Sequence, residues 1–127
     1  MKIKNSEVIA KLNGLAEVIN RGEKYPVKFS FALSKNMKAL EALNKDFEAT
    51  RNKFLDEFNV KDENGSPAYQ TTGKIEIAEE HREEWKKSMD ELLDIEVELN
   101  VHTISESVLD GMEITPDVLY ICDFMFE

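Results

Sequence analysis

Apolar residues recur at three- and four-residue steps over two long stretches of this chain, which is the spacing of one face of an α-helix. The first apolar row comprises Val8, Leu12, Leu15 and Ile19. Asn5 or Ser6 can cap the helix that carries this row, because their side chains accept hydrogen bonds from exposed backbone N–H groups. Gly22 follows the row, so the sequence predicts that this first helix ends near residues 20–22.

The second stretch is longer, since no proline or glycine interrupts the chain between Val27 and Asn64. An apolar row with seven-residue spacing comprises Leu33, Leu40, Phe47 and Phe54. The pattern predicts a helix of about eight turns, roughly 45 Å long. Such a helix either packs against its own chain or pairs with a second copy, and Asn44 and Arg51 in the seam weaken the coiled-coil alternative. The pattern does not fix the first residue of this helix, because apolar and polar side chains also alternate over residues 27–31, as they would in a strand.

Turn chemistry ends this helix, and the pattern then changes. Residues 61–67 read KDENGSP, where Asn-Gly and proline both favour a turn. Two short β-prone runs at 69–72 and 74–77 flank Gly73 and predict a hairpin. Helical spacing returns over residues 79–93, with an acidic first turn that suits the helix dipole.

Residues 94–101 alternate strictly between apolar and polar side chains, which predicts a strand with one buried face. Ile95, Val97, Leu99 and Val101 face one way, and the opposite face carries Asp94, Glu96, Glu98 and Asn100. Asp110-Gly111 predicts a turn. Thr115-Pro116-Asp117 predicts the start of a last helix, because a hydroxyl cap, a first-position proline and an early acid each favour that position.

These elements together predict an α+β fold that forms a single domain over residues 1–127. We expect a long central helix, two or three further helices, and a small antiparallel sheet built from the hairpin and the strand at 94–101. A length of 127 residues is typical of one domain and allows a sizeable core without disulfides or metals. Neither an internal repeat nor a low-complexity linker divides the chain.

Charge is sorted along the chain, and this changes the expected partner. Residues 1–60 hold 11 lysines and arginines against 8 acids, whereas residues 61–127 hold 5 against 18, which gives the formal net charge of −10. Phosphate backbones would be repelled by this charge, so we expect no direct nucleic-acid binding. No apolar run reaches the length of a membrane span, and the start of the chain lacks signal-peptide features. A protein partner is the expectation.

Residue types with catalytic or metal-binding chemistry are sparse. Cys122 is the only cysteine and lies in an apolar run, which favours a buried, inert thiol and a reducing compartment. His81 and His102 fall on different predicted elements, and one cysteine with two histidines is too few for a zinc site. Residues 62–65 resemble only a fragment of a calcium loop. We therefore predict no catalytic, metal-binding or cofactor-binding residue, and a protein that is not an enzyme.

Two groups of acids are the candidate partner-binding residues: Glu79, Glu80, Glu83 and Glu84 on the third helix, with Asp94, Glu96 and Glu98 on the outer strand face. A solvated surface is the plainest interpretation of them. Joined into one negative surface, they would instead dock a basic partner or imitate nucleic acid. The strand carboxylates alone would lie about 7 Å apart, a spacing that could hold a divalent cation in a hydrolase.

Three segments together resemble a family of small proteins of unknown function that phages and prophages of Gram-positive bacteria encode. The segments are PVKFSFALSKN at 26–36, KDENG at 61–65 and DELLDIEVEL at 90–99. The resemblance covers nearly the whole chain, although its motifs are packing and turn motifs. It implies a phage origin and an accessory role near tail or lysis functions, and it carries no catalytic residues over to this chain.

The leading functional hypothesis is a non-enzymatic phage accessory protein that acts by protein–protein interaction in virion or tail assembly. It would lie in the host cytoplasm or on the virion, and the long helix could support a homo-oligomer. The alternative is an acidic phage inhibitor that occupies the nucleic-acid site of a host defence enzyme. A metal-dependent hydrolase at the strand carboxylates is the third hypothesis.

Overall fold

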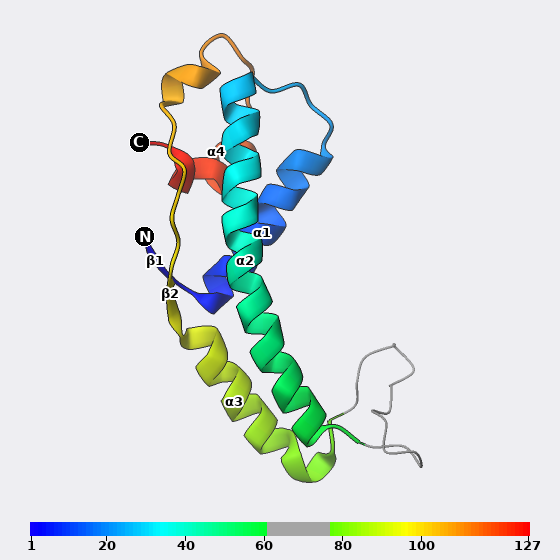
Figure 1. Cartoon of the computed structure of the whole chain (residues 1–127). Helices are drawn as coiled ribbons and strands as arrows, with labels where there is room; N and C mark the ends of the chain where they lie inside the picture. The colour runs from blue at the N-terminus through cyan, green and yellow to red at the C-terminus, as the bar shows by residue number, and fades with distance from the viewer. Residues whose placement is uncertain (61–76) are drawn as a thin grey trace. The chain divides into compact units, whose positions relative to one another are not determined.

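The computed structural model describes residues 1–60 and 77–127, which fall into two compact units. Unit 1 comprises residues 1–44 and 96–127, and unit 2 comprises residues 45–95. Helix α2 (Val27–Phe58) runs through both units. The α+β class predicted from the sequence is confirmed, with a long helix and a two-stranded antiparallel sheet (Figure 1).

The sheet belongs to unit 1 and pairs β1 (Lys2–Lys4) with β2 (Glu96–Glu98). Ile3 lies opposite Val97 and is buried, so the short ladder turns one apolar face inward. No strand was predicted at this beginning of the chain, so β1 is an element that the sequence pattern did not indicate. Three residues are too few to establish a two-residue period, and only their pairing with β2 identifies them as a strand.

The strand predicted over residues 94–101 is real but shorter than expected. Asp94 is the last residue of helix α3, and the side chain of Ile95 is half exposed instead of buried. The ladder ends at Glu98 because its partner strand is only three residues long. One further backbone bond follows, in which Leu99 N–H donates to Met1 C=O over 2.8 Å. The hairpin predicted at 69–77 lies outside the described residues, apart from Ile77.

Helix α1 (Asn5–Asn20) buries Val8, Leu15 and Val18. Its apolar face therefore ends at Val18, and the predicted member Ile19 is 42% exposed. The helix begins at Asn5, so neither Asn5 nor Ser6 acts as its cap. Instead the Glu7 carboxylate accepts a hydrogen bond from the Lys4 backbone N–H over 3.2 Å, which satisfies one of the free donors at this helix end.

The C-terminal part of unit 1 consists of short helices around a tight turn: η2 (Glu106–Leu109), α4 (Pro116–Cys122) and η3 (Asp123–Met125). A parallel bridge joins Ile104 to Phe126, and Phe126 stacks on Phe29 of α2 with ring centroids 6.3 Å apart. These contacts close the main core, whose fully buried side chains include Phe29, Leu15, Leu40, Leu99, Met125, Val18 and Val118.

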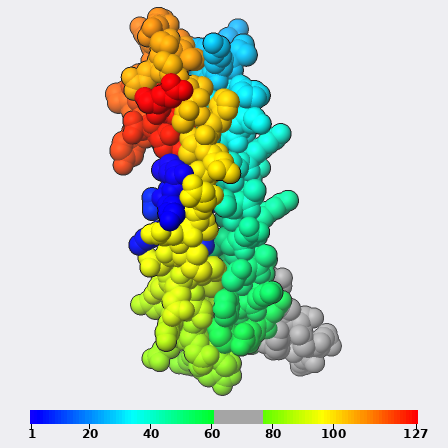
Figure 2. Space-filling model, turned by 60° about the vertical axis from the view of Figure 1, so that its left-hand side comes forward, coloured from blue at the N-terminus to red at the C-terminus, as the bar shows by residue number. Residues whose placement is uncertain are grey.

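The segment that follows β2 is fixed to α2 by Asn36, a polar side chain with no exposed surface. Its amide nitrogen donates to the His102 carbonyl over 3.0 Å, and its amide oxygen accepts from the His102 backbone N–H over 2.8 Å. One side chain thus satisfies both backbone groups of a residue that belongs to no ladder. Figure 2 shows this segment, in yellow to orange, lying along the first part of α2.

Unit 2 contains the second part of α2, the short helix η1 (Glu79–His81) and helix α3 (Arg82–Asp94). Phe58 is buried, stacks on Phe54 at 6.0 Å and contacts the His81 ring at 5.2 Å. Leu92 is buried on α3. The Ala78 backbone N–H donates to the Phe58 carbonyl, which fixes the entry into η1 at the end of α2.

The seven-residue apolar row of α2 is covered by this chain. Leu33 and Leu40 lie in the core of unit 1, and Phe47 is only 7% exposed. These contacts correspond to the intramolecular alternative for the long helix. A second copy could reach this row only by displacing side chains that already pack on it.

Candidate functional site

The four glutamates predicted to bind a partner lie together at the start of α3. Glu79 and Glu80 are in η1, Glu83 and Glu84 occupy the first turn of α3, and all four are exposed. Between them, His81 Nε2 lies 3.7 Å from Glu80 Oε1, and His81 Nδ1 lies 3.9 Å from Glu84 Oε1. These four acids therefore lie close together on unit 2, with His81 and Arg82 between them in the sequence.

The carboxylates predicted on the outer strand face are opposed by lysines. Glu98 is paired with Lys2 and Glu96 with Lys4 across the antiparallel ladder, so each acid has a cation directly opposite. Glu98 Oε1 also accepts a hydrogen bond from the Met1 ammonium group over 2.8 Å, and that charged bond lowers the pKa of Glu98. The negative potential of this face is therefore partly cancelled, which sequence analysis missed because it did not recognise β1.

Asp94 differs from the two strand acids in its position. It ends α3 in unit 2, whereas Glu96 and Glu98 belong to unit 1. Among the described residues, no group of three or more histidine, cysteine, aspartate or glutamate side chains is placed to hold a metal ion.

Cys122 is buried, as the sequence predicts, and has no exposed surface. Burial raises the pKa of its thiol to about 11, because an apolar environment disfavours the thiolate. A thiol that stays protonated near neutral pH is a poor nucleophile. Cys122 therefore acts as a small side chain of the main core, at the end of α4.

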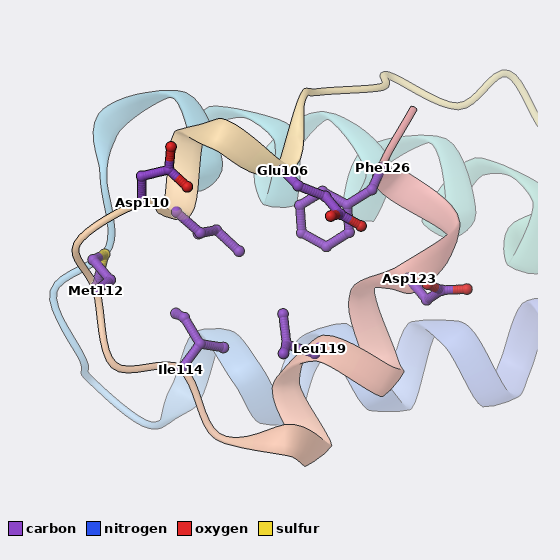
Figure 3. A pocket seen from close by; sticks show the side chains of 8 residues that line it. Glu106, Asp110, Met112, Ile114, Leu119, Asp123 and Phe126 are labelled. Atoms are coloured by element: carbon purple, nitrogen blue, oxygen red, sulfur yellow. The ribbon is translucent and has the colours of Figure 1, made fainter.

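Unit 1 also has a concave surface that was not predicted from the sequence. We call it the acidic pocket; it has a volume of about 510 Å³ and is lined by Glu106, Leu109, Asp110, Met112, Ile114, Leu119, Asp123 and Phe126. Figure 3 shows Ile114 and Leu119 pointing into it from below and the Phe126 ring closing its far side. The pocket is formed entirely by residues 106–126 of one unit.

Charge in this pocket has one sign. The Glu106 carboxylate lies in front of the Phe126 ring and Asp110 stands at the rim, while the Asp123 carboxylate points away from the centre (Figure 3). No lysine or arginine lines the pocket, and no described cation forms an ion pair with Glu106 or Asp110. A sequence signal did exist: residues 99–127 contain six acids and no lysine or arginine.

The backbone around the pocket is shaped by its turn. Gly111 has a φ of +82°, a conformation that side-chain-bearing residues rarely adopt, so the predicted Asp110-Gly111 turn is confirmed. This turn places Asp110 and Met112 on the pocket wall. Loop and turn residues carry no period, which explains why the pattern analysis did not predict the pocket.

A charged cluster holds α4, which supplies Leu119, against the end of α1. Arg21 hydrogen-bonds to the Asp117 carboxylate, to Glu17 over 3.0 Å and to the Thr115 hydroxyl over 3.4 Å. Its guanidinium group holds the pKa of Asp117 well below the usual range. The Thr115 hydroxyl thus bonds to Arg21 and does not cap α4 as predicted. The cluster fixes one wall of the pocket.

Comparison of the chain with protein-family models, with curated proteins and with solved structures finds no match. Within residues 1–60 and 77–127, no helix is both long enough and apolar enough to cross a lipid bilayer.

Proposed function

We propose that this protein acts by protein–protein interaction and that its acidic pocket receives a partner segment in which an apolar side chain adjoins a lysine or arginine. The observation that carries the proposal is that exposed apolar walls and carboxylates without an ion-pair partner among the described residues line one cavity. Leu119 is 44% exposed although it points into the pocket. An isolated carboxylate cluster would bind only charge, whereas this pocket also offers apolar surface.

The two features favour one kind of occupant. Burying one large apolar side chain of a partner contributes about 1.5–3 kcal/mol, which gives a docking pocket its affinity. A cation placed near Glu106 and Asp110 adds orientation and speeds association, because complementary charges steer the encounter. Neutral or acidic apolar segments would gain the first contribution without the second.

The resemblance to phage-encoded proteins supports a more specific role for this interaction. We propose a phage accessory role, in virion or tail assembly, for which a docking pocket without catalytic groups is sufficient. Copurification with virions would test this role, and absence of the protein from purified particles and from assembly intermediates would contradict it.

Binding of a short probe tests the pocket directly. The probe is a fluorescein-labelled peptide of alternating phenylalanine and lysine, and fluorescence anisotropy measures its affinity. We expect the double variant Glu106→Gln, Asp110→Asn to weaken binding about tenfold, since each tenfold step corresponds to only about 1.4 kcal/mol. Glu113→Gln with Glu127→Gln is the matched control, because it removes two nearby acids that do not line the pocket.

An equal loss of peptide affinity in both double variants would show that binding depends only on the overall charge of the protein. This result would overturn the proposed pocket. A second peptide with glutamate in place of lysine checks the sign of the interaction. Tight binding of that peptide would also contradict the proposal.

The acidic start of α3 supports the alternative function, an inhibitor that occupies a basic nucleic-acid site. Four exposed glutamates within six residues resemble closely spaced phosphates in charge. We expect Glu79, Glu80, Glu83 and Glu84, changed together to glutamine, to abolish salt-sensitive binding to a basic host nuclease. Nuclease binding that survives this change would exclude the alternative function. Nuclease binding that also requires Glu106 and Asp110 would assign the contact to the acidic pocket.

A further inference from the structure

A second surface of unit 1 has the opposite character to the acidic pocket. We call it the Phe31 groove; it measures about 390 Å³ and is lined by Val27, Lys28, Phe31, His102 and Ile104. Val27 is 84% exposed and Phe31 is 52% exposed, and the two lie together in one groove, so they form a contiguous apolar patch. The Phe31 ring is held edge-on against the His102 ring at 5.3 Å.

Two lysines lie at this groove. Lys28 lines it, and the Lys35 ammonium lies over the Phe31 ring, 5.8 Å from the centroid. Neither lysine pairs with a carboxylate among the described residues. The sequence explains why: residues 24–40 contain four lysines and no aspartate or glutamate. Exposed apolar side chains beside lysines are the chemistry that the acidic pocket lacks.

We propose that the occupant of the acidic pocket is the Phe31 groove of a second copy of this chain. The inference rests on the proposed function of that pocket and names its partner. Val27 and Phe31 would pack on the Leu119 and Ile114 walls, and Lys28 and Lys35 would lie near Glu106 and Asp110.

Charge complementarity is the argument for a second copy. Within unit 1 the positive segment at 24–40 carries a formal charge of +4, and the segment at 99–127 carries −6. Each copy therefore presents both halves of the contact on a single unit. Two copies carrying −10 each repel at long range, but at physiological ionic strength that repulsion is screened beyond about 8 Å. Pairs buried in the contact are screened much less.

The contact joins two different surfaces. It is reciprocal only if the groove of each copy contacts the pocket of the other copy. A reciprocal pair closes as a twofold dimer, and a one-way contact continues into a ring or filament. Either assembly leaves the apolar row of α2 inside its own chain. The inference therefore differs from a coiled coil through Leu33 and Leu40, which are buried.

Sedimentation equilibrium of the intact protein, from micromolar to millimolar concentration, measures the association. We expect a concentration-dependent increase in mass, weakened at least about tenfold by Lys28→Glu with Lys35→Glu, and equally by Glu106→Lys with Asp110→Lys. Mixing these two double variants restores association, because the negatively charged groove of one variant then meets the positively charged pocket of the other. The matched controls are Lys38→Glu and Glu113→Lys, exposed residues of the same segments that line neither surface.

A second measurement does not depend on the folding of variants. Zero-length crosslinking of carboxylates to amines, in a mixture of ¹⁵N-labelled and unlabelled protein, should join Lys28 or Lys35 of one copy to Glu106 or Asp110 of another. Mass spectrometry would identify the mixed-isotope crosslinks. Crosslinks that join other residue pairs exclusively would overturn the proposed contact.

The outcomes separate this inference from the proposed function. A strict monomer that still binds the phenylalanine–lysine peptide overturns the second copy as partner and leaves the pocket proposal standing. A monomer that does not bind the peptide overturns both. Association that the charge reversals leave unchanged, or that mixing does not restore, also overturns the inference.

Discussion

At the scale of single residues, Asn36 and Gly14 each have a structural role that the residue type alone does not indicate. Asn36 lies fully buried in the middle of an apolar helix face, and Gly14 lies inside a helix, where glycine is usually unfavourable. In each case the reason is a contact with a segment far away in the sequence. The following two predictions test those contacts.

Replacing Asn36 with alanine should destabilise the protein by about 2–4 kcal/mol, because two partly buried backbone groups of His102 lose their partner. Urea unfolding measured by circular dichroism gives this free energy. Ser34→Ala is the matched control on the same helix, since Ser34 is exposed. A loss below that of the control would mean that the His102 backbone finds other partners.

Gly14 allows α1 to approach α4 closely. A Cβ atom at Gly14 would lie 2.9 Å from Ile121 Cγ2, too near for ordinary contact. Alanine gains about 1 kcal/mol of helix propensity there but incurs an overpacking cost of about 1–3 kcal/mol, so we expect Gly14→Ala to lower the melting temperature. Asn13→Ala is exposed on the same helix and should raise it. Stabilisation by both changes would contradict this account of Gly14.

At the scale of elements, unit 1 depends on contacts between pieces too short to be stable alone. Each strand of the sheet has three residues, and α4 is a seven-residue helix. Isolated helices of this length do not persist in water. The Arg21 cluster between α1 and α4 therefore contributes to the position of the pocket wall, and its strength should depend on pH.

Folding lowers the pKa of Asp117, so the folded chain binds fewer protons there than the unfolded chain. The resulting stabilisation is present above about pH 4, the ordinary aspartate range, and is lost as pH falls below it toward the lowered pKa. We expect Asp117→Asn to reduce stability at neutral pH and to remove part of the loss seen on acidification. Urea unfolding between neutral pH and pH 3 measures both effects. A variant with the wild-type acid dependence would exclude this contribution.

At the scale of the whole molecule, periodic segments could be predicted from the sequence and pairings between distant segments could not. The long helix follows from its uninterrupted heptad-spaced row, and the buried thiol follows from the apolar run around Cys122. Strand β1 was missed because only its partner at Glu96–Glu98 identifies it. For the same reason, the lysines opposite Glu96 and Glu98 could not be foreseen.

The sorting of charge along the chain was visible early, but its consequence is different from the one first expected. The predicted acids are divided between the two units, and those on β2 face lysines. The acidic segment after residue 99 instead folds around the acidic pocket, which Glu106 and Asp110 line together with apolar side chains. Its turn and short helices have no periodic signature, so only the structure brings these residues together.

Titration of the ¹⁵N-labelled protein with the phenylalanine–lysine peptide, followed by backbone amide NMR shifts, tests the docking pocket most directly. We predict shifts concentrated at Leu109, Ile114, Leu119 and Phe126, with little change at Glu79–Glu84. Shifts confined to Glu79–Glu84, or spread evenly over all acidic segments, would contradict the account.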